Sequence, residues 1–278
     1  MKNYLKTLYI SDLDGTLLGA DQSLSAESAG ILRNVTSSGS FFTFATARTA
    51  ESALKIMENA GVNVPCILMN GVCIYDMLRE EYVLCRYIPQ SEAALTAKEL
   101  DRQDFGGFLY RIDSGKLSCY FTELKNNAMK EFFNTRKIRY NKNFIKVDSL
   151  SQVCDDKVVY FCVIASKDRL EPLKMTVSET PGLRYEFYGD VYDNTSWYLE
   201  VFHESASKSA GVEFLRRNYG FDRVVAFGDN YNDLPLLRSA DLSFAVENAV
   251  DEVKKAADRI THIGVAAEIQ RLAENQHN

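Results

Sequence analysis

The chain has 278 residues, a formal net charge of −6 and a sequence pI near 5.3. This acidic balance argues against a general nucleic-acid binder or a protein that binds anionic membranes, because both need a basic surface. No stretch approaches the ~18 consecutive apolar residues of a membrane-spanning helix, and no early segment has the pattern of a secretory signal. We therefore expect a cytoplasmic protein without a nucleic-acid or membrane partner. The length predicts one large domain or two, at ~150 residues per domain.

The cysteine and histidine residues do not form the sequence patterns of common metal sites or catalytic nucleophiles. The six cysteines are scattered and lack a C-x-x-C pair, so we expect buried, reduced thiols. With only three histidines, a Ser/His/Asp triad is poorly supplied and a His-rich metal site is not expected. Carboxylate side chains are therefore the candidates for catalytic groups.

The first candidate site follows the apolar run Leu5 to Ile10, which predicts a short buried strand. Asp12 and Asp14 come directly after it, and Gly15 follows them. Residues i and i+2 of a strand share a side, so the two carboxylates are expected to point broadly together. Such a pair needs a shared proton or a cation, and oxygen ligands suit Mg²⁺. The alternative is an ordinary polar turn.

The next segments alternate helix and strand. The pattern predicts a helix over Ser25 to Ser38 with Ser25 as N-cap, a strand over Phe41 to Ala45, a helix over Ala50 to Asn59 and a strand over Pro65 to Met69. This alternation is typical of a parallel sheet with right-handed crossovers. Ligands bind such sheets beyond the carboxyl ends of the strands, where Asp12, Thr46 and Asn70 fall.

The pattern changes after Gly71. Val72 to Tyr75 and Tyr82 to Ile88 suggest an antiparallel hairpin. Beyond it we expect helices over Ser91 to Asp101, Leu124 to Thr135 and Asp168 to Ser178, and strands over Phe108 to Ile112, Leu117 to Phe121, Lys157 to Ala165 and Arg184 to Tyr188. This mixture predicts an α+β domain over residues 89–189, inserted into a core made of residues 1–88 and 190–278.

The alternation resumes from Ser196. We expect strands over Trp197 to Phe202, Val224 to Phe227, Leu242 to Val246 and Arg259 to Ile263, and helices over Lys208 to Asn218, Leu234 to Arg238, Ala249 to Ala257 and Val265 to Ala273. The C-terminal segment is therefore expected to complete the parallel sheet.

A second acidic cluster follows one of these strands. Gly228 permits a tight turn before Asp229, and Asp233 lies one helical turn further on. The alternative is simple N-capping of the next helix. Two acidic clusters, each at the carboxyl end of a strand in one predicted sheet, favour a metal site.

These residues together resemble the haloacid dehalogenase superfamily. The resemblance rests on Asp12-Leu13-Asp14-Gly15-Thr16-Leu17-Leu18, Thr46-Ala47-Arg48, Asn70-Gly71, Lys208 and Gly228-Asp229-Asn230-Tyr231-Asn232-Asp233. Their order and spacing look like the Cof-type sugar-phosphatase branch, which carries a large cap after the third strand. The resemblance implies an α/β fold, with a Rossmann-like parallel sheet core, helices on both faces and an inserted α+β cap.

The resemblance also implies roles for individual residues. Asp12 would attack phosphorus and become an aspartyl-phosphate, while Asp14 would act as general acid and then general base. Mg²⁺ would be held by the Asp12 side chain, the Asp14 backbone carbonyl and Asp229, with Asp233 in support. The phosphoryl oxygens or the adjoining part of the substrate would contact Thr46, Ala47, Lys208, Asn232, Arg48 and Asn70.

Three residues depart from the branch's usual pattern, namely Ala47, Ser209 and Glu247, and none removes a reacting group. Other readings stay open for four site residues. Thr46 could simply end a strand, and Lys208 could be a solvated helix residue. Asn70-Gly71 could be a hairpin turn, and Arg48 the partner of a neighbouring carboxylate.

The sequence thus predicts a Mg²⁺-dependent phosphatase that hydrolyses phosphate monoesters of small metabolites, with sugar phosphates first. One alternative is a phosphotransferase or phosphomutase that uses the same intermediate. Another is a non-catalytic phosphoacceptor or metabolite-binding protein.

Overall fold

The computed structural model describes residues 5–190 and 195–277. The chain divides into two compact units. The first comprises Met1–Leu84 and Ser207–Asn278, and the second comprises Cys85–Ala206. The second unit is therefore an insertion, with boundaries that lie outside the predicted 89 and 189.

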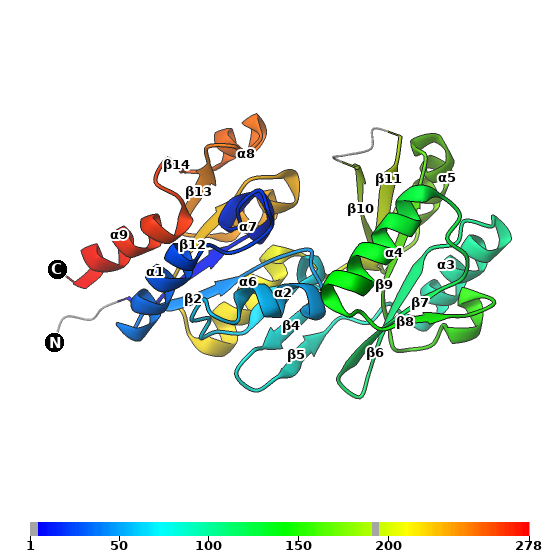
Figure 1. Cartoon of the computed structure of the whole chain (residues 1–278), viewed down its shortest axis with the longest axis horizontal. Coiled ribbons are helices and arrows are strands. Elements are labelled where there is room, and N and C mark those ends of the chain that lie inside the picture. The colour runs from blue at the N-terminus through cyan, green and yellow to red at the C-terminus, as the bar shows by residue number, and fades with distance from the viewer. Residues whose placement is uncertain (1–4, 191–194, 278) are drawn as a thin grey trace. The chain divides into compact units, whose positions relative to one another are not determined.

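The first unit is built on a five-stranded parallel sheet in the order β14-β13-β12-β1-β2 (Figure 1). Its strands are β1 (Thr7–Ser11), β2 (Phe41–Phe44), β12 (Arg223–Gly228), β13 (Leu242–Val246) and β14 (Arg259–Thr261). All five residues of β1 are buried, so both faces of the sheet are covered there. The predicted α/β core is confirmed.

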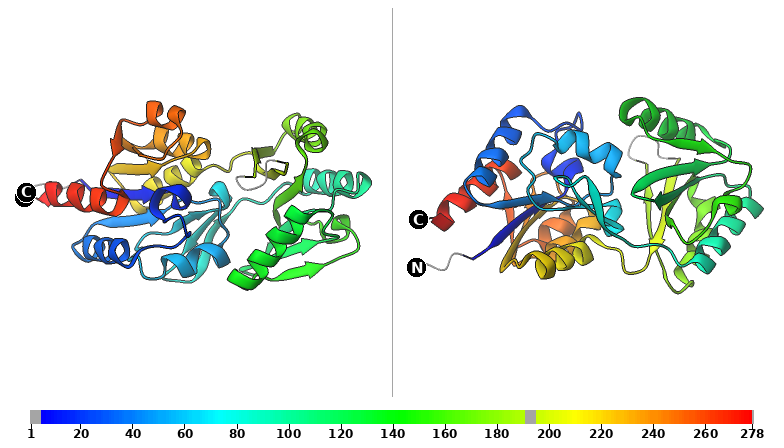
Figure 2. Two further views of the ribbon diagram at one scale, coloured as in Figure 1. Left: turned by 45° about the horizontal axis from the view of Figure 1, so that its top comes forward. Right: turned by 90° about the horizontal axis from the view of Figure 1, so that it is seen from below.

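Six helices accompany this sheet among the described residues: α1 (Ala26–Ser37), α2 (Ala50–Met57), α6 (Lys208–Tyr219), α7 (Leu234–Ser239), α8 (Asp251–Ala256) and α9 (Val265–His277). Helices α1 and α9, blue and red in Figure 2, pack together, as do α6 and α7. Ser25 caps α1 as predicted, since its hydroxyl accepts a hydrogen bond from the Ser28 amide at 3.0 Å.

The strand expected over Pro65 to Met69 adjoins the parallel sheet only through an isolated bridge within the described residues. Strand β3 (Cys66–Leu68) pairs antiparallel with β4 (Cys73–Asp76), and both belong to a separate sheet with β5 (Glu81–Cys85). One parallel bridge, between Ala45 and Ile67, still joins β3 to the end of β2. The chain reverses in the turn Met69–Gly71, and this short return makes the antiparallel pairing possible.

The second unit contains a six-stranded sheet in the order β10-β11-β9-β6-β7-β8. Its strands are β6 (Phe108–Asp113), β7 (Lys116–Phe121), β8 (Phe144–Lys146), β9 (Val158–Ala165), β10 (Leu183–Gly189) and β11 (Trp197–His203). Its helices are α3 (Gln90–Arg102), α4 (Asn127–Tyr140) and α5 (Lys167–Ser178). Leu100 of α3 and Leu173 of α5 share one hydrophobic core with Phe161 and Leu199 of the sheet.

The assignment of Trp197 to Phe202 to the parallel sheet is wrong. Strand β11 pairs antiparallel with β10 on one side and with β9 on the other. Leu199 and Val201 consequently enter the core of the second unit. Periodicity finds this strand, but only its hydrogen-bonding partners decide to which sheet it belongs.

No helix in the described part of the chain combines the length and the apolar composition that crossing a lipid bilayer requires.

Candidate active site

The carboxyl edge of the parallel sheet gathers three of the predicted segments. Ser11, the last residue of β1, is in register with Phe44 of β2 and with Phe227 of β12. The next residue, Asp12, donates its amide to the Phe227 carbonyl at 3.0 Å. Because all three strands run in parallel, the segments that begin at Asp12, Thr46 and Asp229 leave the sheet at the same edge.

Lys208 links the two acidic clusters. Its Nζ lies 2.5 Å from Asp12 Oδ1 and 2.6 Å from Asp233 Oδ1, and both contacts are buried. Ser207 begins α6 at this point, because its hydroxyl accepts the Ala210 amide at 3.0 Å. Lys208 itself is 2% exposed, so it is not a solvated helix residue. The structure thus makes Lys208 the counter-ion of two buried carboxylates.

Asp12, Asp229 and Asp233 each place a carboxylate oxygen within 4.8 Å of the others. Asp233 is fully buried, and its Oδ2 accepts the amides of Asp229 and Asn230 at 3.0 and 3.1 Å. Thr16 donates its hydroxyl to Asp229 Oδ1 at 2.8 Å. These bonds fix two of the three carboxylates from the protein side.

Burial and mutual repulsion disturb the titration of this cluster. Burial raises the pKa of Asp12 well above its usual value, and the charge of Asp233 adds to the effect, while Lys208 opposes it. Burial also raises the pKa of Asp229 to about 6; the Thr16 hydrogen bond opposes this shift and Asp233 reinforces it. Burial works to lower the pKa of Lys208, but the charges of Asp12 and Asp233 raise it. Three carboxylates with one ammonium leave an excess of negative charge for a cation to neutralise.

The donor set fits Mg²⁺. This ion prefers oxygen ligands in an octahedron at about 2.0–2.1 Å, so neighbouring and opposite ligand oxygens are separated by roughly 3 to 4 Å. The three carboxylate oxygens all lie within 4.8 Å of one another, close enough to share such an ion. Within the described residues, this trio is the group of His, Cys, Asp and Glu side chains close enough to share a metal ion. The Asp14 carboxylate is not among them.

Asp14 instead forms a bidentate ion pair with Arg48. The Arg48 Nε lies 2.7 Å from Asp14 Oδ2, and its Nη2 lies 2.6 Å from Oδ1. From the sequence, Arg48 was predicted to contact phosphate or substrate, with a neighbouring carboxylate as the alternative partner. The structure shows the carboxylate partner.

The remaining predicted residues lie around the same edge. Thr46 is buried, and its Oγ1 accepts the Arg48 amide at 3.1 Å. Ala47 is exposed, and Asn232 is half-buried in the turn Tyr231–Asp233. Asn70 is buried in the turn after β3, and its amide donates to the Thr46 carbonyl at 3.0 Å.

Sequence reasoning gave no role to two residues that shape the site. Thr16 holds Asp229, and Asn248 donates its Nδ2 to the Gly15 carbonyl at 2.7 Å. Gly15 has φ +79°, and a Cβ there would lie 2.4 Å from Asp229 Oδ2. A glycine at position 15 indicates that another part of the chain comes close to the backbone there. The sequence does not show which part, because Asp229 is more than two hundred residues away.

The model of the haloacid dehalogenase-like hydrolases matches residues 9–264, which is most of the chain. The chain belongs to this family. The expected superfamily and the expected enzyme class, a hydrolase, are thereby confirmed.

Members of this family with known names match over nearly the whole chain. The pyridoxal phosphate phosphatase of Escherichia coli is 23% identical over 256 residues, which cover 89% of this chain and 90% of that protein. A crystal structure from Thermotoga maritima has a TM-score of 0.77 and 25% identity, covering 96% and 97% of the two chains. A sugar phosphatase of HAD subclass IIB has a TM-score of 0.74 and 21% identity, covering 96% and 98%. The expected resemblance to the sugar-phosphatase branch is confirmed at the level of the fold.

Two departures from the branch's pattern have local partners. The Ser209 hydroxyl lies 2.8 Å from that of Ser207, at the start of α6. The Glu247 carboxylate lies 2.6 Å from His262 Nδ1, and both side chains are about two-thirds exposed. The negative charge of Glu247 is therefore shared with His262 and solvent.

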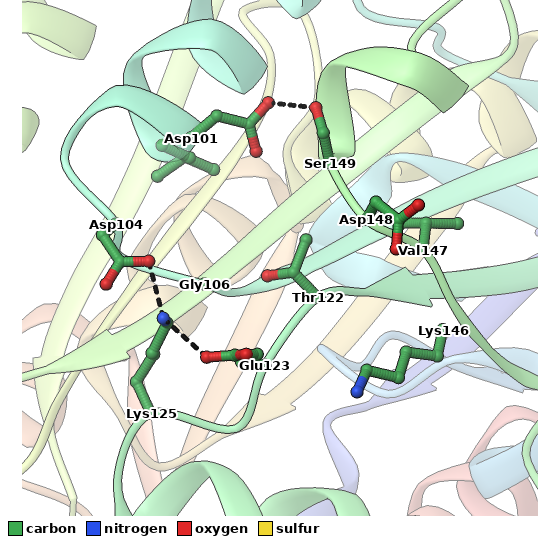
Figure 3. Close-up of a pocket in the computed structure, with 11 residues that line it drawn as sticks. Asp101, Asp104, Gly106, Thr122, Glu123, Lys125, Lys146, Val147, Asp148 and Ser149 are labelled. Carbon is green, nitrogen blue, oxygen red and sulfur yellow. Dashed lines mark hydrogen bonds and ion pairs between the residues drawn. The ribbon is translucent and has the colours of Figure 1, made fainter.

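The second unit contains a cavity of about 320 Å³, shown in Figure 3. It lies between the end of α3 and the segments that follow β7 and β8. Its charged side chains are largely paired, since Asp101 accepts the Ser149 hydroxyl at 2.7 Å, and Lys125 bridges Asp104 and Glu123 at 2.6 and 2.8 Å. None of the predicted catalytic residues lines this cavity.

Proposed function

We propose that this chain is a Mg²⁺-dependent phosphatase that hydrolyses phosphate monoesters of small metabolites, sugar phosphates first, through an aspartyl-phosphate on Asp12. The observation that carries the proposal is the buried arrangement in which Lys208 contacts Asp12 and Asp233 while Asp229 lies within reach of both carboxylates. Membership of the haloacid dehalogenase-like hydrolases supports it.

In the first step, an Asp12 oxygen attacks phosphorus and the bond from phosphorus to the ester oxygen breaks. Lys208 fixes the Asp12 carboxylate and supplies positive charge beside it. Asp14 gives a proton to the departing alkoxide, which leaves as an alcohol. Thr46, Ala47 and Asn232 would donate hydrogen bonds to the phosphoryl oxygens.

In the second step, water attacks the phosphorus of the aspartyl-phosphate. Asp14, now ionised, removes a proton from that water, and the acyl-phosphate bond breaks. Inorganic phosphate leaves and the Asp12 carboxylate is restored. Asp14 therefore exchanges one proton in each direction during a turnover.

The carboxylates of Asp12, Asp229 and Asp233 and the Asp14 backbone carbonyl would hold Mg²⁺. When bound, this ion supplies positive charge that shields the phosphoryl oxygens from the attacking carboxylate.

The second unit, Cys85–Ala206, is proposed to be the cap domain that selects the substrate. It is inserted between β5 and α6, and it has a sheet and a hydrophobic core of its own. Its Tyr188 is 43% exposed and stacks on Tyr198, an arrangement suited to contact with a ring. The relatives named above act on pyridoxal phosphate and on sugar phosphates, which supports small phosphorylated metabolites as substrates.

The test is phosphate release from a panel of sugar phosphates, nucleotides and pyridoxal phosphate, with Mg²⁺ and with EDTA. Asp12→Asn is the matched variant, because it keeps the size of the side chain while Lys208 retains Asp233 as a partner. We expect Mg²⁺-dependent release from the wild type and none from the folded variant.

Two other outcomes would contradict the proposal. Transfer of the phosphoryl group to an added sugar in preference to water would indicate a phosphotransferase or phosphomutase. A phosphorylated Asp12 that persists for minutes without phosphate release would indicate a phosphoacceptor protein.

A further inference from the structure

The turn between β3 and β4 has an unusual backbone. Met69, Asn70 and Gly71 have φ values of 51°, 54° and 93°, so three consecutive residues adopt the left-handed conformation. Two of them carry side chains, for which this region is unfavourable, although Asn tolerates it better than most residues. The surrounding structure must hold such a turn in place.

Contacts from two predicted site segments hold it. The Met69 amide donates to the Arg48 carbonyl and the Asn70 amide donates to the Thr46 carbonyl, both at 3.0 Å. On the other side, a Cβ on Gly71 would lie 2.0 Å from the Ser207 carbonyl oxygen, so the turn packs directly against the residue before Lys208. Asn70 therefore lies between the segments that carry Thr46 and Lys208.

The Asn70 side chain is 5% exposed, and its Oδ1 has no hydrogen-bond donor within the described parts of the chain. Leaving a buried acceptor unpaired is unfavourable, because its hydrogen bonds to water are lost and not replaced. Buried polar groups are nearly always paired, so an exception next to a predicted active site calls for a partner from outside the protein.

The chemistry of a carbonyl oxygen limits that partner. Oδ1 only accepts hydrogen bonds, and the oxygens of a phosphate monoester dianion only accept them as well. The phosphoryl group is therefore a poor partner for it. A suitable donor is an O–H or N–H group on the organic part of the substrate, close to the ester bond.

We infer that Asn70 is a specificity-determining residue whose Oδ1 accepts a hydrogen bond from a hydroxyl or amino group on the carbon next to the phosphoester carbon. This inference rests on the proposed phosphatase function and deepens it. The first unit would then prefer phosphorylated vicinal diols and amino alcohols over simple alkyl phosphates. Any selection by the second unit would add to this preference.

The experiment compares substrates that differ by one hydroxyl group. They are 1,2-propanediol 1-phosphate, n-propyl phosphate and, for the position of the hydroxyl, 1,3-propanediol phosphate. For the wild type we expect kcat/KM to be about tenfold or more higher with the 1,2-diol than with the other two, because a site with a buried acceptor rejects ligands that leave it unpaired. p-Nitrophenyl phosphate, which lacks such a donor, serves as the reference substrate.

Asn70→Gly removes the amide and keeps a residue that adopts positive φ freely. We expect it to reduce the preference for the 1,2-diol to within about twofold, through a larger fall in kcat/KM with the 1,2-diol than with p-nitrophenyl phosphate. Asn70→Asp keeps an acceptor and tolerates the left-handed backbone, so it should retain the preference. Asn141→Gly is the matched control, because Asn141 has φ 49° at the end of α4, in the second unit.

The opposing results are distinct. Three results would show that Asn70 only shapes the turn: an unchanged preference in Asn70→Gly, a loss of the preference in Asn70→Asp, or an equal fall in kcat/KM with all four substrates. Each of them would overturn this inference while the proposed function stands. A wild type that prefers none of the alkyl phosphates would do the same. A wild type that releases phosphate from no monoester would overturn the proposed function and this inference together.

Discussion

The guanidinium group of Arg48 holds both carboxylate oxygens of Asp14, at 2.7 and 2.6 Å. The Arg48 side chain is 11% exposed, whereas that of Asp14 is 48% exposed. Arg48 also reaches the Ser52 carbonyl and the Gln22 side chain, at 3.4 and 3.3 Å. The arginine is thus the anchored member of the pair, and it decides where the proposed acid and base lies.

We therefore expect Arg48→Lys to impair proton transfer, because a lysine keeps the charge but loses the planar fork. With alkyl phosphates kcat/KM should fall about 10²-fold. With p-nitrophenyl phosphate, whose leaving group needs no proton, the first step should be spared and a burst of p-nitrophenol should precede slow turnover. Arg33→Lys, in α1, is the control. Equal losses in kcat/KM with both substrates would contradict a positioning role.

Lys208 is expected to stabilise the fold as well as the reaction. In Lys208→Met the carboxylates of Asp12 and Asp233 stay buried without their counter-ion, which should lower the free energy of unfolding by about 3 kcal/mol. A divalent cation binds only the folded site, so Mg²⁺ should restore part of this loss. Urea denaturation in EDTA and in Mg²⁺ measures both effects. The exposed Lys55→Met should change stability by no more than about 0.5 kcal/mol, and a similar result for Lys208→Met would exclude the role.

Gly15 and Gly115 form a matched pair for testing the metal site. Their φ values are +79° and +74°, but an added Cβ would lie 2.4 Å from Asp229 Oδ2 at Gly15 and would contact nothing within 4 Å at Gly115. Both alanine variants should lose about 1 kcal/mol from the backbone. Only Gly15→Ala should also weaken the increase in melting temperature that Mg²⁺ produces, because it displaces Asp229. Equal responses of the two variants to Mg²⁺ would argue against Asp229 as a ligand.

Glu200 should make stability depend on pH. It is 9% exposed and accepts the Tyr160 hydroxyl at 2.7 Å. Burial raises its pKa; hydrogen bonds from Tyr160 and Tyr188 oppose the shift, the charge of Glu186 adds to it, and that of Arg136 opposes it. The unfolded chain therefore releases this proton at lower pH than the folded protein, so stability is full below about pH 4.3 and falls as pH rises through the folded-state pKa.

Glu200→Gln should remove that dependence, since a neutral amide can still accept the tyrosine bonds. We expect the variant to match the wild type near pH 4 and to gain relative stability as pH rises. Urea denaturation across pH 4 to 8 measures the difference, with the exposed Glu131→Gln as control. A wild type that gains stability relative to Glu200→Gln over this range would show that the buried carboxylate is favourable.

The sequence alone predicted most helices and strands, because buried strands and amphipathic helices leave apolar patterns at fixed spacing. It also placed Asp12, Thr46, Asn70 and Asp229 at the ends of strands. Strand β8 and the short helical segments Leu13–Leu17 and Leu150–Val153 were not predicted, since none of these three segments shows a recognisable apolar period.

Tertiary structure decided which elements pair and which charges meet. Strand β11 has the pattern of a buried strand in either unit, and hydrogen bonds to β9 and β10 assign it to the second. Arg48 and Asp14 are 34 residues apart and Thr16 and Asp229 are 213 apart, so no local spacing predicts either contact. The sequence by itself determined the family motifs and the α/β core. The partner of Arg48, the unpaired Asn70 oxygen and the boundary of the second unit depend on contacts between distant segments, which only the folded chain brings together.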